Sequence, residues 1–153
     1  MSIKDITIVI ASFKSDEKVV NCLNSINGQC KVIIVENSNN FEFKREFEKK
    51  FENVECILTG SNLGYGKANN IGLKKVKTKY ALILNPDTEL SNQTLKNFIK
   101  AADLLSDFAI LAPHNQVKEN DETENFPPKL VKSVKGFAMF LNLIEFKHVG
   151  FFD

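Results

Sequence analysis

Short apolar runs alternate with helix-like patterns through the first 112 residues of the chain. The first run, Ile6–Ala11, is almost continuously apolar, which is typical of a strand covered on both faces. The later runs are Val32–Val35, Val54–Leu58, Tyr80–Leu84 and Phe108–Ala112. Strands that alternate with helices form parallel sheets with helices on both faces. We therefore predict an α/β fold with a mostly parallel, Rossmann-like sheet.

Four helices are predicted between these runs, each from apolar residues at helical spacing. The first contains Val19, Leu23 and Ile26 after a cap at Ser15, and the second contains Phe43, Phe47 and Phe51. The third spans 68–76, and the fourth runs from a cap at Ser91 to Leu105. The phenylalanine stripe is interpreted as packing on the sheet, and an aromatic platform for bases is the alternative. Two further strands are predicted over 130–134 and 136–143.

Composition limits the class of protein. The length of 153 residues is that of one domain, so residues 1–153 are expected to form a single one. A net charge of +1 lacks the basic excess of nucleic-acid-binding proteins, and no nucleic-acid partner is predicted. The cysteines Cys22, Cys30 and Cys56 form no C-x-x-C pair, which argues against zinc and favours reduced thiols.

Localisation is predicted from what the sequence does not contain. No apolar run reaches the roughly 20 residues that span a bilayer, and the start of the chain lacks the pattern of a signal peptide. We expect a cytoplasmic protein, with a peripheral position at the inner face of the membrane as the alternative. Residues 115–128 are polar and acidic and end in Pro127-Pro128, so a mobile surface loop is expected there.

Polar residues follow three predicted strands at their carboxyl ends, where open α/β sheets bind ligands. They are Ser12-Phe13, Glu36-Asn37-Ser38 and Asn85-Pro86-Asp87-Thr88. The segment Gly60–Gly72 holds four of the seven glycines, and glycine at a helix start lets backbone N–H groups approach a phosphate. Because Gly66-Lys67 is not followed by Ser or Thr, it is not a P-loop, and a tight turn without a ligand is the alternative.

Asp87 is the candidate metal ligand. Pro86 restricts the backbone after the predicted strand, and a carboxylate there can hold Mg²⁺ or Mn²⁺ against a diphosphate. The Asn85 amide oxygen would add a weaker, neutral ligand. The alternative is a plain turn before the next helix. Glu36 has a similar pair of interpretations, an exposed carboxylate at a strand end or an acceptor for a base N–H.

Four motifs occur in order along the chain. They are IVIASFK (8–14), VIIVENS (32–38), N-x-G-x-G-x-A-N-N-x-G (62–72) and LNPD (84–87). Together they resemble the nucleotide-sugar-binding half of family 2 glycosyltransferases, of the GT-A fold, especially the rhamnosyltransferase-like branch. The resemblance implies metal-assisted, inverting transfer of a sugar from a nucleoside diphosphate to an acceptor hydroxyl. It also implies a role in polysaccharide or glycan biosynthesis, with a glycan or lipid-linked acceptor.

The resemblance implies roles for individual residues. Ser12 and Phe13 would lie near the nucleoside, and Glu36 stands where the family usually has an Asp that reads the base. The other predicted nucleotide-binding residues are Asn62, Gly64, Asn69, Asn70 and Asn85. Asp87 is the last acid of the D-x-D position and implies Mg²⁺ or Mn²⁺. Asn85 replaces the first Asp of that motif.

The resemblance stops before the catalytic base of the family. Gly150–Asp153 resembles the segment that leads towards a Glu-Asp catalytic motif. We therefore expect a domain truncated at its C-terminus, with no catalytic residue assigned, and a non-catalytic nucleotide-binding domain is the alternative function. Truncation would leave an apolar surface uncovered and favour a homo-oligomer. That surface is predicted around Phe137, Phe140, Phe146, Phe151 and Phe152.

Overall fold

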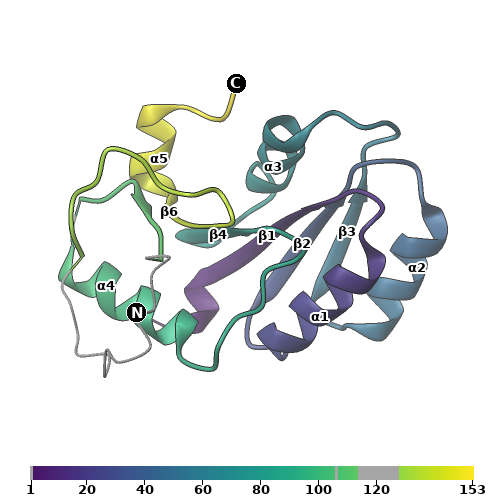
Figure 1. Cartoon of the computed structure of the whole chain (residues 1–153), viewed down its shortest axis with the longest axis horizontal. Helices are drawn as coiled ribbons and strands as arrows, with labels where there is room; N and C mark the ends of the chain where they lie inside the picture. Colours follow the sequence, from purple (N-terminus) through teal and green to yellow (C-terminus); the bar gives the residue numbers. More distant parts are fainter. Residues whose placement is uncertain (1, 106, 114–127) are drawn as a thin grey trace.

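The computed structural model describes residues 2–105, 107–113 and 128–153. Within these ranges six strands form one sheet in the order β3-β2-β1-β4-β6-β5 (Figure 1). The strands are β1 (Ile6–Ser12), β2 (Lys31–Glu36), β3 (Val54–Leu58), β4 (Tyr80–Leu84), β5 (Ile110–Leu111) and β6 (Ala138–Asn142). The helices are α1 (Asp16–Ile26), α2 (Phe41–Lys50), α3 (Tyr65–Leu73), α4 (Thr94–Leu104) and α5 (Leu143–Val149), after a 3-10 turn at Ile3–Asp5.

The order of the strands changes direction at β1: β2 and β3 lie on one side of it, and β4 lies on the other. Strands β2 and β4 both pair with β1 in parallel, and β3 pairs in parallel with β2. Strand β6 pairs antiparallel with both β4 and β5. The predicted α/β class with a mostly parallel sheet is confirmed. The point between β1 and β4 is a topological switch point, the usual place for a ligand in such sheets.

Helices cover both faces of the sheet, as Figure 1 shows. One face packs against α1, α2 and α4 through a large apolar cluster that includes Ile8, Ile34 and Leu82. The other face packs against α3 and α5 through smaller clusters that include Val9 and Ile83. Alternate residues of β1 point to opposite faces, which explains why its sequence is apolar throughout.

The phenylalanine stripe of α2 packs on the sheet, as predicted. Phe43 and Phe47 are buried in the same cluster as the strand residues. Their ring centroids lie 3.9 Å apart in a stacked arrangement, and Phe51 lies beside them, partly buried. These rings therefore form core and offer no platform for bases.

The C-terminal part of the chain differs from the prediction. Residues 130–134 form no strand: Leu130 and Val131 are exposed to solvent, and neither pairs with a strand in the described part of the chain. The strand predicted over 136–143 is shorter, since the Asn142 side chain accepts a hydrogen bond from Ile144 N at 3.3 Å and starts α5. The predicted loop 115–128 lies outside the described residues, apart from Pro128.

Ser91 does not cap α4. The Ser91 hydroxyl lies 2.9 Å from Thr94 Oγ1, and the Thr94 hydroxyl accepts from Ser91 N at 3.1 Å. The helix therefore begins at Thr94, after Gln93. No helix in the described part of the chain is both long enough and apolar enough to cross a membrane.

The predicted uncovered apolar surface near the C-terminus is not observed. Phe140 and Phe146 are buried, and Phe137 and Phe152 are partly buried against the core. Phe151 alone among the five lies at the exposed boundary, at 36%. Phe137 and Phe140 pack on the face covered by α1, α2 and α4, and Phe146 and Phe152 pack on the face covered by α3 and α5, so these residues do not supply the exposed surface on which self-association was predicted.

Candidate functional site

The carboxyl ends of β1 and β2 bring Ser12 and Glu36 side by side. The two residues are partners in the strand register, and both are almost fully buried. The Ser12 hydroxyl lies 2.9 Å from the Ser15 hydroxyl just before α1. The Ser12 carbonyl accepts a hydrogen bond from Asn37 N at 2.6 Å. The carboxyl ends of β1 and β2 are therefore fixed by hydrogen bonds with the segments that follow them.

The Glu36 carboxylate is buried and accepts several hydrogen bonds. Its donors are the Ser38 hydroxyl at 2.8 Å, Ser38 N at 3.2 Å and Asn40 N at 3.3 Å. These bonds hold the turn that leads into α2, whose N-terminal end favours a negative charge. A carboxylate has about four acceptor positions, so Glu36 can still accept a bond from a ligand. The exposed-carboxylate interpretation of Glu36 is wrong.

Asn37 organises the site, although the motifs gave it no role. Its Nδ2 donates to Asn62 Oδ1 at 3.0 Å and lies 3.4 Å from the Gly64 carbonyl oxygen. Its Oδ1 accepts from Leu63 N at 2.9 Å and from the Thr59 hydroxyl at 3.3 Å. The signal in the sequence was a polar amide directly after a buried strand.

The glycine-rich loop turns sharply into α3. Gly60 and Gly64 have φ values of +79° and +81°, a conformation that side chains with a Cβ rarely adopt. Asn62 Oδ1 accepts from Gly64 N at 3.0 Å and so fixes the turn before α3. The N–H groups of the first turn of α3 have no acceptor within the helix, as in any α-helix. An N-terminus of this kind favours an anion.

Asn69 and Asn70 lie further along α3 and face different surroundings. Asn69 is completely buried, and its Nδ2 donates to the Tyr65 carbonyl at 3.0 Å. Its Oδ1 is a buried side-chain atom without a hydrogen-bond partner among the described residues. Asn70 instead bonds to the backbone of Phe152 through both atoms of its amide.

The segment after β4 forms a turn, which is compatible with both interpretations of Asp87. Thr88 N donates to the Asn85 carbonyl at 3.1 Å, and Asn85 N donates to the Phe137 carbonyl at 2.9 Å. Asp87 projects from this turn with 58% of its side chain exposed, 4.0 Å from Lys18 Nζ. Such an exposed ion pair is weak, so the carboxylate stays accessible.

The described residues contain no group of three or more His, Cys, Asp or Glu side chains that could hold a metal ion. Asp87 therefore does not belong to a closed cage of protein ligands. Mg²⁺ and related ions are often bound by one or two carboxylates together with substrate phosphates and water. The accessible carboxylate of Asp87 fits a site of that open kind.

An exposed aromatic ring lies at the end of β1. Phe13 is 42% exposed, and Lys14 Nζ lies 5.3 Å from the centroid of its ring. Since the flat faces of large apolar rings are normally buried, an exposed ring beside the strand ends is available to a planar ligand. Phe13 lies next to Ser12 in the chain and thus beside Glu36.

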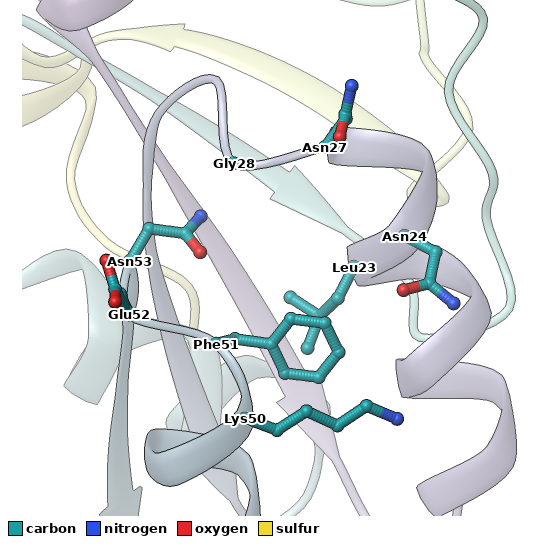
Figure 2. A pocket seen from close by; sticks show the side chains of 8 residues that line it. All are labelled: Leu23, Asn24, Asn27, Gly28, Lys50, Phe51, Glu52 and Asn53. Atoms are coloured by element: carbon teal, nitrogen blue, oxygen red, sulfur yellow. The ribbon is translucent and has the colours of Figure 1, made fainter.

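A shallow hollow of about 380 Å³ lies at the opposite end of the strands, near the amino ends of β2 and β3 (Figure 2). It forms where α1 and α2 end, between Leu23 and Asn27 on one side and Phe51 and Asn53 on the other. None of the predicted site residues lines it. The candidate site at the carboxyl ends of the strands is therefore separate from this hollow.

Comparison with solved structures shows the fold that this chain shares with other proteins. Residues 1–349 of TarS from S. aureus superpose with a TM-score of 0.70 at 16% identity, over 100% of this chain and 50% of that one. The mannosyltransferase PcManGT from Pyrobaculum calidifontis, in complex with GDP-Man and Mn²⁺, gives 0.72 at 11% identity, over 97% and 47%. The shared fold is the GT-A fold, as predicted.

The sequence shows the family directly. Residues 7–151 match Glycosyl transferase family 2, and the chain belongs to that family. The low-salt glycan biosynthesis hexosyltransferase Agl10 of Haloferax volcanii is 28% identical over 96 residues, which are 60% of this chain and 31% of Agl10. A teichoic acid poly(glycerol phosphate) polymerase of Staphylococcus epidermidis is 26% identical over 103 residues, or 62% and 14% of the two chains. The chain thus spans about half the length of these solved structures and matches a smaller share of the curated relatives.

Proposed function

We propose that the carboxyl edge of the sheet binds the nucleoside diphosphate of a sugar donor, as part of an inverting glycosyltransferase. The observation that carries the proposal is the convergence of Ser12, Glu36 and the glycine-rich loop at one edge, locked together by Asn37. These residues lie at the carboxyl ends of parallel strands, where such folds bind ligands, and β1 borders the switch point of the sheet. Solved structures of similar fold contain GDP-Man with Mn²⁺ or UDP-GlcNAc.

Each part of the edge suits one part of the donor. The exposed Phe13 ring can stack on a base, and the Glu36 carboxylate can accept a hydrogen bond from a base N–H. The N–H groups at the start of α3 suit the diphosphate, because a helix N-terminus attracts anions. Asn62 and Gly64 shape that turn.

Asp87, with the Asn85 amide as a weaker ligand, is the residue that would hold Mg²⁺ or Mn²⁺. Its exposed carboxylate leaves room for diphosphate oxygens and water as the remaining ligands. The bound ion would neutralise charge on the leaving diphosphate. The proposed acceptor is a hydroxyl of a glycan or lipid-linked glycan, which the biosynthetic names of the two curated relatives support. The proposed location is the cytoplasm, at the inner face of the membrane where a lipid-linked acceptor would be presented.

Inversion requires the acceptor hydroxyl to attack the anomeric carbon from the side opposite the diphosphate. The C–O bond to the diphosphate breaks as the new glycosidic bond forms, and the hydroxyl proton passes to a base. The diphosphate must therefore be held still while the sugar is left open on its far side. A rigid strand edge with an anion-binding helix start provides that restraint.

The test is a thermal-shift and calorimetric screen of the chain against UDP, GDP, UDP-GlcNAc and GDP-Man, each with and without Mn²⁺. A nucleoside diphosphate at 100 times its Kd should stabilise the fold by about 2.7 kcal/mol. UMP and GMP are the matched controls, since they keep the base but lack the diphosphate. If no nucleoside diphosphate binds in either condition, the proposed function is wrong.

A further inference from the structure

The backbone of residues 151–153 is bonded to α3 by one side chain. Asn70 Nδ2 donates to the Phe152 carbonyl at 2.6 Å, and Asn70 Oδ1 accepts from Phe152 N at 3.1 Å. The amide thereby satisfies the donor and the acceptor of one backbone residue at once. These two bonds use one of the two N–H donors and one of the two acceptor positions of the amide, so the role predicted for Asn70 in nucleotide binding stays a prediction beside this contact.

Gly66 makes the close approach possible. A Cβ built on Gly66 would lie 3.1 Å from the Asp153 carbonyl oxygen and 3.3 Å from Phe152 Cβ, closer than side chains normally pack. Gly66 is a helical residue without a positive φ, so the fold does not need glycine there for its backbone conformation. The requirement comes from the neighbouring segment.

Aromatic packing holds the same segment from the other side. The Phe146 ring of α5 meets Phe151 edge-on at 6.0 Å and Phe152 at 5.8 Å between centroids. Phe152 also packs against the cluster that contains Val9 and Leu73. The segment is therefore attached to both helices on this face of the sheet, and Figure 1 shows the chain leaving α5 towards α3.

We propose that Asn70 and Gly66 are positioning residues that hold residues 151–153 as a wall of the donor site. Gly66 lies in the first turn of α3, directly after the loop that Asn37 attaches to β2, so the segment reaches the strand-end edge beside the proposed diphosphate position. This inference rests on the proposed function for the nature of the ligand. The placement of the wall rests only on the contacts of Asn70, Gly66 and Phe152.

The experiment measures amide hydrogen exchange at residues 150–153 of the whole chain, together with affinity for UDP and GDP in Mn²⁺. Asn70→Leu keeps the side-chain volume but removes both hydrogen bonds, so exchange at Phe152 should rise at least about tenfold, the equivalent of about 1.4 kcal/mol. Asn70→Asp keeps the acceptor for Phe152 N–H and loses the donor, so its exchange rate at Phe152 should lie between those of the parent and of Asn70→Leu. Affinity for UDP and GDP should fall together with the loss of protection at Phe152, because a displaced segment no longer encloses the donor site. Faster exchange with unchanged affinity would show that Asn70 holds the segment but that the segment is no wall of the site.

Gly66→Ala gives a second route to the same result. Alanine favours a helix more than glycine does, so faster exchange at 152–153 in this variant would arise from the displaced segment and not from a weakened helix. Asn24→Leu is the matched control, because Asn24 is an exposed asparagine on α1 at the opposite face.

Unchanged exchange at Phe152 in Asn70→Leu would overturn the proposal. If exchange is unchanged and UDP and GDP affinity is lost, Asn70 is a nucleotide contact. If the parent chain binds neither nucleotide, the proposed function fails, and the exchange data still decide whether Asn70 holds the segment. Should Asn70→Leu not fold, Asn70→Asp and Gly66→Ala carry the same test.

Discussion

The Asn37 side chain donates to Asn62 Oδ1 at 3.0 Å and so joins the end of β2 to the glycine-rich loop before α3. Asn37 is only 4% exposed, and its Oδ1 also accepts from Leu63 N at 2.9 Å. Hydrogen bonds of this kind are strongest where water is excluded. One buried amide therefore fixes the loop that brings the start of α3 to the carboxyl ends of the strands.

Replacing Asn37 with alanine should destabilise the fold and weaken nucleotide binding together. The change leaves Leu63 N–H without its acceptor and removes one of the two donors to Asn62 Oδ1, at a cost of about 1–3 kcal/mol in the free energy of unfolding. Urea unfolding measures the first effect and calorimetry with UDP or GDP the second. Asn24→Ala, on the exposed side of α1, should stay within about 0.5 kcal/mol. An unfolding free energy equal to that of the parent would contradict the role of Asn37.

Glu36→Gln should weaken both the turn before α2 and the contact with a base. Glutamine keeps one acceptor oxygen, but its NH₂ group would face the donors at Ser38 and Asn40. We expect a loss of about 1.5–3 kcal/mol in nucleotide binding, the usual range for a charged hydrogen bond. Ser38→Ala is the control: it removes a donor to the carboxylate and leaves the carboxylate in place. If both variants bind GDP and UDP as the parent does, Glu36 has only a structural role.

Asp87→Asn should abolish the effect of Mn²⁺ on nucleotide binding while leaving the fold intact. The Asp87 side chain is 58% exposed, and its ion pair with Lys18 at 4.0 Å is long, so its removal should change unfolding by less than about 0.5 kcal/mol. Titration of the variant with UDP or GDP, with and without Mn²⁺, measures the metal-dependent part of the affinity. Glu89→Gln, two residues away, is the matched control. An unchanged Mn²⁺ effect in Asp87→Asn would show that another group holds the ion.

The sequence predicted the central strands well because their signal is local. A continuous apolar run such as Ile6–Ala11 can only be a covered strand or a buried helix, and its short length decides between them. The positions of the carboxyl ends then follow from the parallel order of the strands, which predicts that Ser12 and Glu36 lie side by side. The resemblance to the family also depended on local motifs.

Features that depend on distant contacts were not predictable in this way. The bond between Asn70 and Phe152 joins residues 82 positions apart, and nothing near Asn70 in the sequence indicates its partner. Leu130 and Val131 have the composition of a strand, but strand formation requires a neighbouring edge with free backbone groups. The capacity of Asn37 to bond four groups arises only when the loop after β3 folds back over it.

Gly72→Ala should destabilise the fold even though alanine favours helices. A Cβ at Gly72 would overlap Val9 Cγ1 and lie 3.1 Å from Val35 Cγ2, at the contact of α3 with β1 and β2. Overpacking of this kind costs about 1–3 kcal/mol, which exceeds the gain of about 1 kcal/mol from helix propensity. Denaturant unfolding measures the difference.

Two further variants test the cause of that effect. Gly136→Ala adds a Cβ whose only close neighbour among the described residues is Tyr65 Oη, at an ordinary 3.7 Å, so it should be nearly neutral. Combining Gly72→Ala with Val9→Ala removes the overlapping methyl groups, so the pair should be more stable than the sum of the two single effects. Additive single effects would mean that the steric contact is not the reason.

Stability should fall as the pH rises above about 9, because three buried thiols resist ionisation. Burial raises the pKa of Cys22 to about 12, with Glu89 and Asp87 adding to the shift, and raises the pKa of Cys30 to about 11. Burial likewise raises the pKa of Cys56 to about 12. Below the unfolded pKa of 9.0, the thiols are protonated in both states and stability does not depend on them. Above it, the unfolded chain loses these protons first, so each thiol lowers the free energy of unfolding by up to about 1.4 kcal/mol per pH unit.

Urea unfolding with a reductant at several values between pH 7.5 and about 10.5 measures this dependence. Lysine and tyrosine side chains also titrate towards the upper end of the range, so the informative quantity is the difference between the parent and Cys22→Ala. The variant should be less stable at pH 7.5, since it leaves a small cavity in the core, yet lose stability less steeply as the pH rises. Curves that stay parallel above pH 9 would show that the Cys22 thiol ionises equally well in the folded and unfolded chain.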